Sequence, residues 1–249
     1  MESHFLFMKY FIGYVFVFFA ILLIRYFVTA GMFYAYYLKI KTNPTTTKIL
    51  SRRPVNKKHV KKEIYWSILS SAIFALFGAV TYWLWLHDLT AIYLDPAKYG
   101  YWYLPLSLLI VLIVHETYYY WLHRTMHHPR IFKFVHRVHH QSISTTPWTA
   151  FSFHPWESVL EALIVPLILL IVPVNIYVLL FYLIFMTFSS VINHLDIEVY
   201  PAFFRKSWFG KLWIDATHHH FHHKEFHTNY GLYFTFWDKF MGTESSKMK

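Results

Sequence analysis

The chain has 249 residues, of which 56% are hydrophobic, 22% aromatic and only 14% charged. A soluble domain typically has about 25% charged residues, so this composition excludes an ordinary soluble protein and favours a membrane protein. Cysteine is absent, which excludes disulfides, thiolate metal ligands and cysteine-held iron–sulfur clusters. The net charge is +10, and no linker, repeat or low-complexity tract interrupts the chain.

The first expected element is an apolar helix over residues 5–38, where only Lys9 and Arg25 are charged. Its first 20 residues are enough to span a bilayer, which takes about 20. A cleaved signal peptide is the alternative, because residues 28–30 loosely resemble a cleavage site. The apolar run is longer than the about 7–15 residues of a signal peptide, and Arg25 interrupts it. We therefore expect a retained anchor.

A basic segment follows the first helix. It contains nine basic residues: Lys39, Lys41, Lys48, Arg52, Arg53, Lys57, Lys58, Lys61 and Lys62. Basic runs also occur in nucleic-acid-binding proteins. Beside apolar spans, however, such a run fits a cytoplasmic loop that obeys the positive-inside rule and contacts anionic headgroups. We therefore place this loop in the cytoplasm and expect no nucleic-acid partner.

Three more apolar segments follow in the chain. Residues 64–86 form 23 positions without a charge and are the clearest transmembrane helix, and residues 101–122 form the next span. Residues 162–193 also lack charge but are broken by Pro173-Val174-Asn175. Each half reaches only about 24 Å at about 1.5 Å per residue, which suits a hairpin that enters and leaves the membrane on one side. The N-terminus is then outside the cell.

Histidine clusters are the strongest chemical signal. Fifteen of the 18 histidines lie between His115 and His227, and eight of them form three clusters: His123 and His127; His136, His139 and His140; His219, His222 and His223. Residues three and four apart share a helix face, so each cluster points its imidazoles one way. Eight imidazoles exceed the four to six ligands of one metal. They suit two metals, with zinc, copper, iron and nickel all open on ligand type.

Glu116 is a further candidate. His115-Glu116 begins like the zinc protease motif H-E-x-x-H, but Tyr119 stands where the second histidine is needed, so this motif is excluded. Glu116 lies seven residues before His123, two turns away on the same helical face. Its carboxylate either orients a metal ligand or faces Arg124 or water.

The order and spacing of the motifs resemble the membrane fatty acid hydroxylase / sterol desaturase superfamily over roughly residues 105–243. The matching stretches are Tyr120–His127, His136–His140, Phe153–Glu157, Asn193-His194, His219–His223, Asn229–Gly231 and Phe236–Thr243. The resemblance implies an all-α integral membrane protein with about four to five transmembrane or hairpin helices. It also implies a cytoplasmic histidine-rich helical cap that holds a dinuclear metal site. Residues 1–100 would be the membrane anchor and 101–249 the catalytic region.

The resemblance also implies the cofactors, two iron ions with O2 as co-substrate, and their ligands. By matching positions, the ligands are His123, His127, His136, His139, His140, His194, His219, His222 and His223. Here His194 is the isolated ligand that the family places between its second and third boxes. His218 and His222 also form an H-x3-H pair, so the register of the third box stays open, although only His219 gives H-x2-H-H.

Other residues of this region are expected in supporting places. His128, His154 and His227 are interpreted as structural or as supports for the ligands. Asp238 is interpreted either as a hydrogen-bond partner of a ligand imidazole or as a cap of a helix turn.

The implied activity is O2-dependent oxidation of an unactivated C–H bond in a membrane lipid, most simply hydroxylation of a fatty acyl or sterol-like lipid. Desaturation at the same site is the alternative, and a histidine-rich metal transporter or store is a distant one. A transporter would place its ligands along a path through the membrane, whereas these clusters lie beyond the ends of the spans.

Two kinds of partner follow from this activity. A lipid would reach the site between the third span and the hairpin, where Trp121, Trp148, Phe151 and Phe153 could line its path. Ordinary core and membrane-interface packing is the favoured interpretation of these four residues. The chain has no dinucleotide fingerprint or cytochrome segment, so a separate ferredoxin or cytochrome would supply electrons. That carrier would dock on the basic loop and on a basic C-terminus (Lys247, Lys249). The oligomeric state stays open.

Overall fold

The computed structural model describes residues 2–41, 49–51, 53–54 and 56–248, with side chains described from residue 9 onward. Lys48 and Arg52 of the predicted basic loop and Lys249 of the predicted basic C-terminus lie outside the described residues. Within the described part, four helices are long and apolar enough to cross a membrane. They are α1 (Glu2–Lys41), α2 (Lys57–Leu86), α3 (Tyr103–Met126) and α8 (Ile176–Asn193).

Local chemistry sets where these helices begin. Asn56 precedes α2, and its side chain accepts a hydrogen bond from the Lys58 N–H; Asn175 caps α8 in the same way through the Tyr177 N–H. Such caps satisfy backbone donors that the first helical turn leaves unpaired. Between the caps, long apolar sequences free of interior proline continue each helix. The proline of α3 stands in its first turn, where a missing N–H is tolerated.

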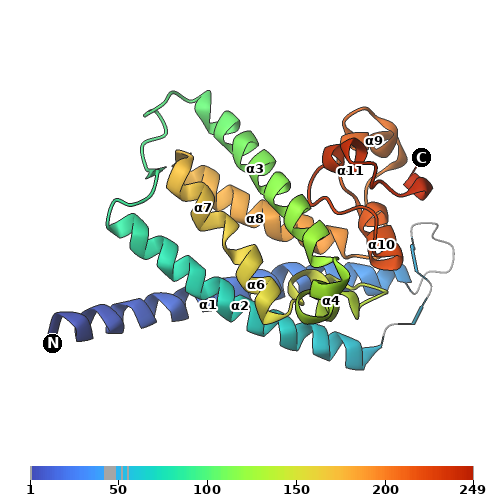
Figure 1. The fold of residues 1–249 in the computed structure, drawn as a ribbon, viewed down its shortest axis with the longest axis horizontal. Helices are drawn as coiled ribbons and strands as arrows, with labels where there is room; N and C mark the ends of the chain where they lie inside the picture. Colours follow the sequence, from blue (N-terminus) through green and yellow to red (C-terminus); the bar gives the residue numbers. More distant parts are fainter. Residues whose placement is uncertain (1, 42–48, 52, 55, 249) are drawn as a thin grey trace.

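Shorter elements complete the fold around this bundle. They are β1 (Ile92–Tyr93), α4 (Pro129–Val135), α5 (Arg137–His140), η1 (Pro147–Phe151), α6 (Pro155–Ala162), α7 (Ile164–Ile171), β2 (Val174–Asn175), α9 (Ala202–Lys206), η2 (Gly210–Leu212), α10 (Ala216–Glu225), α11 (Phe236–Phe240) and η3 (Ser246–Met248). The described chain is thus mainly helical, as predicted. α9, α10 and α11 gather at one end of the bundle, the end where the C-terminus lies (Figure 1).

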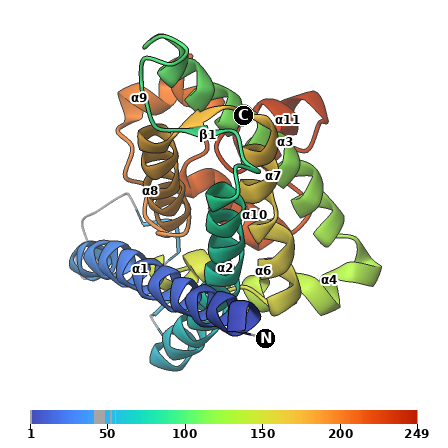
Figure 2. The same ribbon diagram turned by 90° about the vertical axis from the view of Figure 1, so that its left-hand side faces the viewer.

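The predicted hairpin is present, with α6 and α7 as one arm and α8 as the other. Its tip forms β2, which pairs in parallel with β1 in the register Ile92 to Val174 and Tyr93 to Asn175. The Asn175 side chain also donates to the carbonyl of Tyr93. β1 lies in the connection between α2 and α3, so the hairpin reaches the end of the bundle opposite α10 (Figures 1 and 2). The hairpin therefore extends over the full depth of the bundle.

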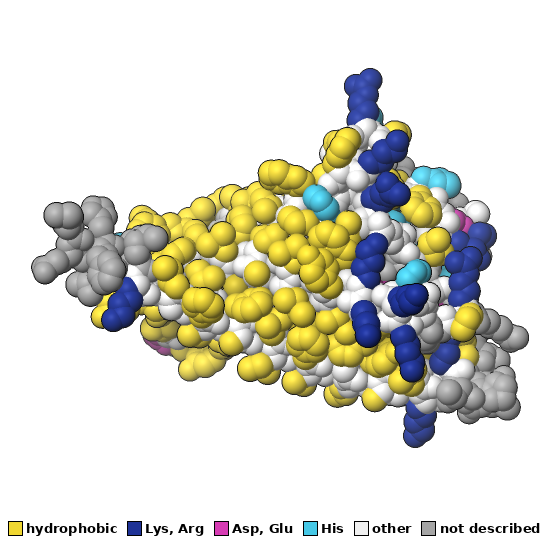
Figure 3. All heavy atoms as spheres, turned by 90° about the horizontal axis from the view of Figure 1, so that it is seen from below, with side chains coloured by type: hydrophobic (Ala, Val, Ile, Leu, Met, Phe, Trp, Pro, Cys, Tyr) yellow, Lys and Arg dark blue, Asp and Glu magenta, His cyan; other side chains and the backbone are white. Residues whose placement is uncertain are grey.

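The surface has the pattern of a multi-pass membrane protein. Large apolar side chains are freely exposed along the bundle, such as Phe16 at 67% and Ile24 at 64%. They form a broad apolar belt, whereas lysine and arginine side chains concentrate at one end (Figure 3). That end includes the first turns of α2 and the short helices α4 and α5.

Packing accounts for most of the aromatic residues that we considered as a lipid lining. Phe151 and Phe153 are buried in one cluster with Tyr26 of α1, and Phe74 of α2 packs against it. Trp148 also packs there, and its backbone carbonyl accepts a hydrogen bond of 2.8 Å from the Tyr26 hydroxyl. These side chains pack in a cluster with residues of α1, α2 and α8, which agrees with the ordinary packing that we favoured for them over a lipid lining. Trp121, on α3, is 42% exposed.

Candidate metal centre

Four parts of the fold carry histidines to one end of the bundle: the last turns of α3, the short helix α5 with the residue before it, the residue after α8, and α10. Their side chains form two groups in which the candidate ligand atoms lie within 4.8 Å of one another. Cluster one contains His123, His127, His136, His140 and His222; cluster two contains His139, His194, His219 and His223. The nine predicted ligands thus come together, divided five and four.

The spacing of the imidazole nitrogens fits a metal ion. In cluster one, the Nε2 atoms of His123 and His136 are 3.0 Å apart, and those of His222 and His140 are also 3.0 Å apart. In cluster two, His219 and His194 approach to 2.9 Å. Ligand nitrogens about 2.1 Å from a metal and at right angles to each other are about 3.0 Å apart. The observed spacing therefore matches neighbouring ligands of one ion, and is shorter than the about 3.4 Å of a tetrahedral site.

The opposite nitrogens fix the orientation of several rings. The Nδ1–H of His123 donates to the Tyr230 carbonyl at 2.9 Å, that of His222 to Thr228 at 2.7 Å, and that of His194 to Ser190 at 2.7 Å. With the proton on Nδ1, each Nε2 carries a lone pair that points into its cluster. Facing lone pairs repel one another unless a cation lies between them. The donor set therefore fits a metal ion in each cluster.

Glu157 is a functional residue that the sequence reasoning missed. Its Oε1 lies 2.6 Å from Nδ1 of His136, and both side chains are fully buried. A carboxylate on the outer nitrogen of a ligand histidine fixes the ring and raises its basicity. The signal was available, because Glu157 is an acidic residue five positions before the long uncharged stretch 162–193. Buried acids at such places are usually functional.

Electrostatics keep the ligands in the form that binds metals. Burial lowers the pKa of His136, His139 and His140 well below the ordinary value, and the neighbouring imidazoles lower it further. Burial likewise lowers the pKa of His194 to about 4. These imidazoles are therefore neutral near pH 7, as metal binding requires.

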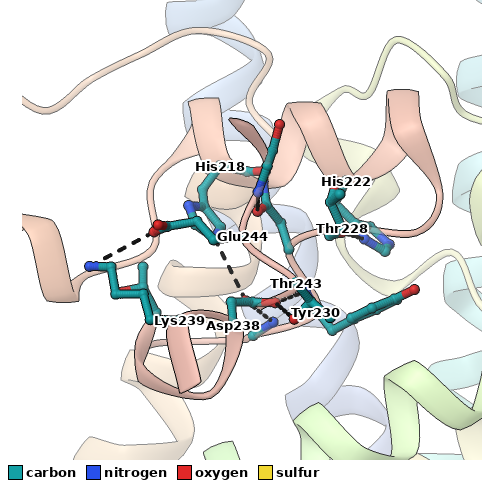
Figure 4. Close-up of polar contacts among 12 residues, drawn as sticks. His218, His222, Thr228, Tyr230, Asp238, Lys239, Thr243 and Glu244 are labelled. Atoms are coloured by element: carbon teal, nitrogen blue, oxygen red, sulfur yellow. Dashed lines mark hydrogen bonds and ion pairs between the residues drawn. The ribbon is translucent and has the colours of Figure 1, made fainter. Parts of the chain in front are cut away.

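The third histidine box has the register with His219. α10 begins at Asp215, whose side chain accepts the His218 N–H at 2.8 Å and caps the helix. His218 then turns away from both clusters, and its Nε2 lies 3.7 Å from Asp238 (Figure 4). His220 points to Asp196, with 3.0 Å between Nδ1 and Oδ1. The two extra histidines of this box therefore face carboxylates outside the clusters, and His220 is hydrogen-bonded to its carboxylate.

Asp238 and Glu116 hold the loop that follows α10. Asp238 accepts hydrogen bonds from the backbone N–H groups of Tyr230 and Gly231, both at 2.9 Å (Figure 4). Glu116, fully buried on α3, accepts from the N–H groups of Leu232, Tyr233 and Phe234. Gly231 is required between them, since a Cβ there would lie 2.6 Å from the Phe234 carbonyl oxygen.

The Glu116 carboxylate is fully buried, so it does not face water, and it has no hydrogen bond or ion pair with a ligand imidazole or Arg124 among the described residues. Three backbone N–H groups of one turn donate hydrogen bonds to the carboxylate instead. Its role in orienting a ligand stays a prediction. The same loop presents the Tyr230 carbonyl to His123, so Glu116 reaches the cluster only through the backbone. Asp238 acts in the same indirect way.

The remaining histidines have structural places. The side chains of His128 and His154 cap α4 and α6 by accepting backbone N–H groups. His227 is exposed. His115 is buried, and its Nδ1 lies 2.6 Å from the Tyr182 hydroxyl and 3.1 Å from the Tyr233 hydroxyl.

The fold and the clusters define a multi-pass membrane protein whose histidine-rich end can hold metal ions. Residues 108–243 match the fatty acid hydroxylase family, more than half of the chain. The chain therefore belongs to this family, within the membrane fatty acid hydroxylase / sterol desaturase superfamily.

Curated relatives agree with this membership. The chain is 27% identical over 192 residues to the Delta(7)-sterol 5(6)-desaturase ERG3B of Gibberella zeae, covering 77% of this chain and 58% of that protein. It is 31% identical over 125 residues to the lathosterol oxidase of Homo sapiens, covering 49% and 39% respectively. The chain thus spans about half the length of the curated relatives it matches. No solved structure matches it.

Proposed function

We propose that this protein is a membrane-bound di-iron oxidoreductase that uses O2 to oxidise an unactivated C–H bond of a membrane lipid. The observation that carries the proposal is the pair of buried clusters with inward-facing Nε2 atoms. When bound, two iron ions supply the redox chemistry that activates O2 toward such a bond. The ligands would be the nine histidines of clusters one and two. Iron is favoured over zinc by family membership.

The chain's own residues prepare the site in three ways. Backbone carbonyls and Glu157 fix the ligand rings, so that the Nε2 atoms are positioned before a metal binds. The ligand side chains are nearly all buried, which excludes bulk water and prevents side reactions. Glu157 also places a carboxylate beside cluster one, which stabilises additional positive charge there.

A sterol-like lipid is the substrate class that we favour. Two of the relatives compared above are named as a sterol desaturase and a lathosterol oxidase. These names favour desaturation over hydroxylation for this chain, although both outcomes begin with the removal of one hydrogen atom. The exposed apolar belt (Figure 3) gives a lipid direct access from the bilayer.

Electrons would come from a separate acidic carrier, of ferredoxin or cytochrome type, on the cytoplasmic side. Supporting this, α4 and α5 expose Arg130, Lys133 and Arg137 beside the ligands that α5 carries. The first turns of α2 expose four more lysines: Lys57, Lys58, Lys61 and Lys62. Lys247 contributes less, because it pairs with Glu225 at 2.8 Å. Activity with a reduced carrier should fall as salt rises; a flat salt response would remove this docking proposal.

The activity itself is tested by product analysis. The protein would be expressed with and without a His222→Ala substitution in cells supplied with labelled sterols and fatty acids, and the lipids compared by mass spectrometry. We expect one lipid to gain an oxygen or lose two hydrogens only with the intact chain. Identical lipid profiles in both samples would contradict the proposal.

A further inference from the structure

The surface of the histidine-rich end carries four large exposed aromatic side chains. Phe203 and Phe240 are each 79% exposed, Trp208 is 78% exposed and Phe209 is 51% exposed. Phe203 lies in α9, Trp208 and Phe209 in the turn between α9 and η2, and Phe240 in α11. We call these four residues the aromatic patch. Large exposed apolar surfaces mark sites for a membrane or a protein partner, so the patch requires an occupant.

Close packing joins these segments into one surface. Gly210, the first residue of η2, allows η2 to lie tightly on α9, because a Cβ there would lie 2.0 Å from the Phe204 carbonyl oxygen. The Thr235 N–H, directly before α11, donates to the Leu212 carbonyl of η2 at 2.9 Å. α9, η2 and α11 are therefore held together, and their exposed aromatic side chains belong to one surface.

Ring contacts connect the patch to the lipid-facing surface of α8. Phe181 of α8 is 54% exposed in the apolar belt, and its ring centroid lies 6.3 Å from that of Phe185. The Phe185 ring lies 5.9 Å from the Trp213 ring, which lies 5.7 Å from the ring of Phe209 in the patch. The apolar surface of α8 thus continues onto the patch.

A second connection runs to α3. Trp121, in the last turns of α3, is 42% exposed, and its ring lies 5.6 Å from the ring of Trp237 in α11. The Trp237 ring lies 6.0 Å from the ring of Phe240 in the patch. α9 and α11 lie on the side of the bundle where α3 and α8 lie, away from α1 (Figures 1 and 2). The patch therefore borders the membrane-facing surface on two helices.

The charges within the patch are positive. Residues 201–214 contain no acidic side chain, and Lys206 and Lys211 are exposed among the aromatic residues. Tryptophan and phenylalanine beside lysine are typical of segments that lie in the membrane interface, where rings enter the headgroup layer and ammonium groups meet lipid phosphates. A water-soluble protein partner would not require the continuity with α3 and α8, whereas a lipid surface does.

We propose that the aromatic patch inserts into the interfacial layer of the bilayer that surrounds α3 and α8. Trp208 and Phe240 reach about 5–10 Å into the boundary between headgroups and acyl chains, and Lys206 and Lys211 pair with anionic headgroups. This contact is additional to the four spanning helices and does not depend on the proposed reaction.

One ion pair joins the patch to the metal centre. Arg205 of α9 pairs with Asp215 at 2.9 Å, and Asp215 caps α10. α10 carries His219, His222 and His223 of the two clusters. The membrane contact therefore sets the position of the third histidine box relative to the bilayer surface, and with it the depth at which a lipid meets the clusters.

Depth measurements test the proposal, and the absence of cysteine from the chain allows a single label at each position. A fluorophore would be attached to Trp208→Cys and, separately, to Phe240→Cys, with the full chain in nanodiscs of phosphatidylcholine and phosphatidylserine. Ile24→Cys, at a residue 64% exposed on α1, is the reference inside the belt. Lys224→Cys, at an exposed residue of α10, is the reference in water. We expect lipids with a headgroup nitroxide to quench both test labels at least about threefold more strongly than the Lys224→Cys label.

Charge reversal tests the contribution of the lysines. Lys206→Glu combined with Lys211→Glu should lower the quenching of the Trp208→Cys label by about twofold or more in discs with phosphatidylserine. The same change should leave it nearly unchanged in discs of phosphatidylcholine alone. Lys57→Glu combined with Lys58→Glu, at two exposed lysines of α2, is the matched control and should have no effect on this label.

Two results would overturn the insertion of the patch. In the first, the Trp208→Cys and Phe240→Cys labels are as open to a water-soluble quencher as the Lys224→Cys label. In the second, both labels are shielded from water and from lipid, which would show that a protein, such as a second copy of the chain, covers the patch. Equal quenching with and without phosphatidylserine would overturn the pairing with anionic headgroups. A native elution profile in detergent confirms that each variant is folded, and none of these readouts depends on turnover.

Discussion

The two histidine clusters are unequal in their support. In cluster one, three of the five outer nitrogens have defined acceptors: the Tyr230 carbonyl, the Thr228 carbonyl and the Glu157 carboxylate. In cluster two, His194 donates to the Ser190 carbonyl, whereas Nδ1 of His139 is buried without a hydrogen-bond partner among the described residues. Nδ1 of His223 is buried without a partner among the described residues. A carboxylate therefore stands behind cluster one only.

This difference predicts different properties for the two metal positions. The carboxylate of Glu157 raises the basicity of a ligand in cluster one and stabilises its ion. Cluster two draws its ligands from α5, α10 and the end of α8, and lacks such support, so its ion should exchange more readily. The two clusters are nevertheless in contact, with the rings of His140 and His223 4.6 Å apart, so we expect them to act as one centre.

The largest effect should follow from removing a ligand of either cluster. His140→Ala and His219→Ala should each lower product formation by at least about 100-fold, because the reaction needs both ions. Product would be measured by mass spectrometry, with His227→Ala as the control at an exposed histidine. Near-native activity of His219→Ala would show that cluster two is dispensable. It would contradict the proposal that the two clusters form a single dinuclear centre.

Glu157→Gln should separate the two clusters. Loss of the carboxylate behind His136 should weaken metal retention in cluster one by about 10- to 100-fold and leave cluster two unchanged. Metal per chain would be counted after dialysis against graded chelator. Glu244→Gln, at a glutamate that pairs with Lys239, is the control. Equal loss from both positions would contradict the assigned asymmetry.

Glu116→Gln should lower the stability of the fold and, through the same loop, weaken metal retention in cluster one. A neutral amide oxygen accepts less strongly from the three N–H groups of the 232–234 turn, and its NH2 group would face N–H donors. We expect a loss of about 1–3 kcal/mol in the free energy of unfolding. Thermal unfolding in detergent measures it, and a higher metal off-rate from cluster one should accompany it because His123 depends on the same loop. An unchanged melting temperature would refute the role of Glu116 in holding the loop.

The smallest predicted effect concerns pH and Asp238. Burial by itself raises the pKa of Asp238, but the nearby His218 imidazole and hydrogen bonds from the Gly231 N–H and the Thr243 hydroxyl outweigh it and leave the pKa below the ordinary value. The charged form thus stabilises the fold above the unfolded-state pKa of about 3.9, and this contribution disappears as pH falls through the lower folded-state pKa. The free energy of unfolding of the native chain should exceed that of Asp238→Asn by about 1 kcal/mol at pH 5–7. This difference in the free energy of unfolding should shrink below about pH 4. A difference that grows there would contradict the lowered pKa of Asp238.

The sequence predicts the ligands better than their supports. Helical spacing within each box and the order of the boxes are local properties, so His123 and His127 could be assigned to one face without a structure. His194 and the His219 register came from the family pattern, and the structure gives their physical basis in the end of α8 and the Asp215 cap.

Glu157 and Glu116 mark where sequence reasoning ends. Glu157 contacts His136, 21 positions away in the sequence, and the packing of α6 against α4, which His136 directly follows, brings them together. Glu116 was paired with His123 by helical spacing, yet the N–H groups that donate to it come from a loop 116–118 residues away. The depth of the hairpin likewise could not be predicted, because it depends on the pairing of β1 with β2. Strands of two residues have no recognisable sequence pattern.

The central claim is that the two clusters together hold two iron ions. The most direct measurement is the metal content per chain of protein purified anaerobically in detergent, beside a His139→Ala variant. We expect about two irons per native chain, the number that two clusters of this ligand count require, and a clear loss in the variant. Zinc, or a single metal that the variant retains unchanged, would contradict the claim.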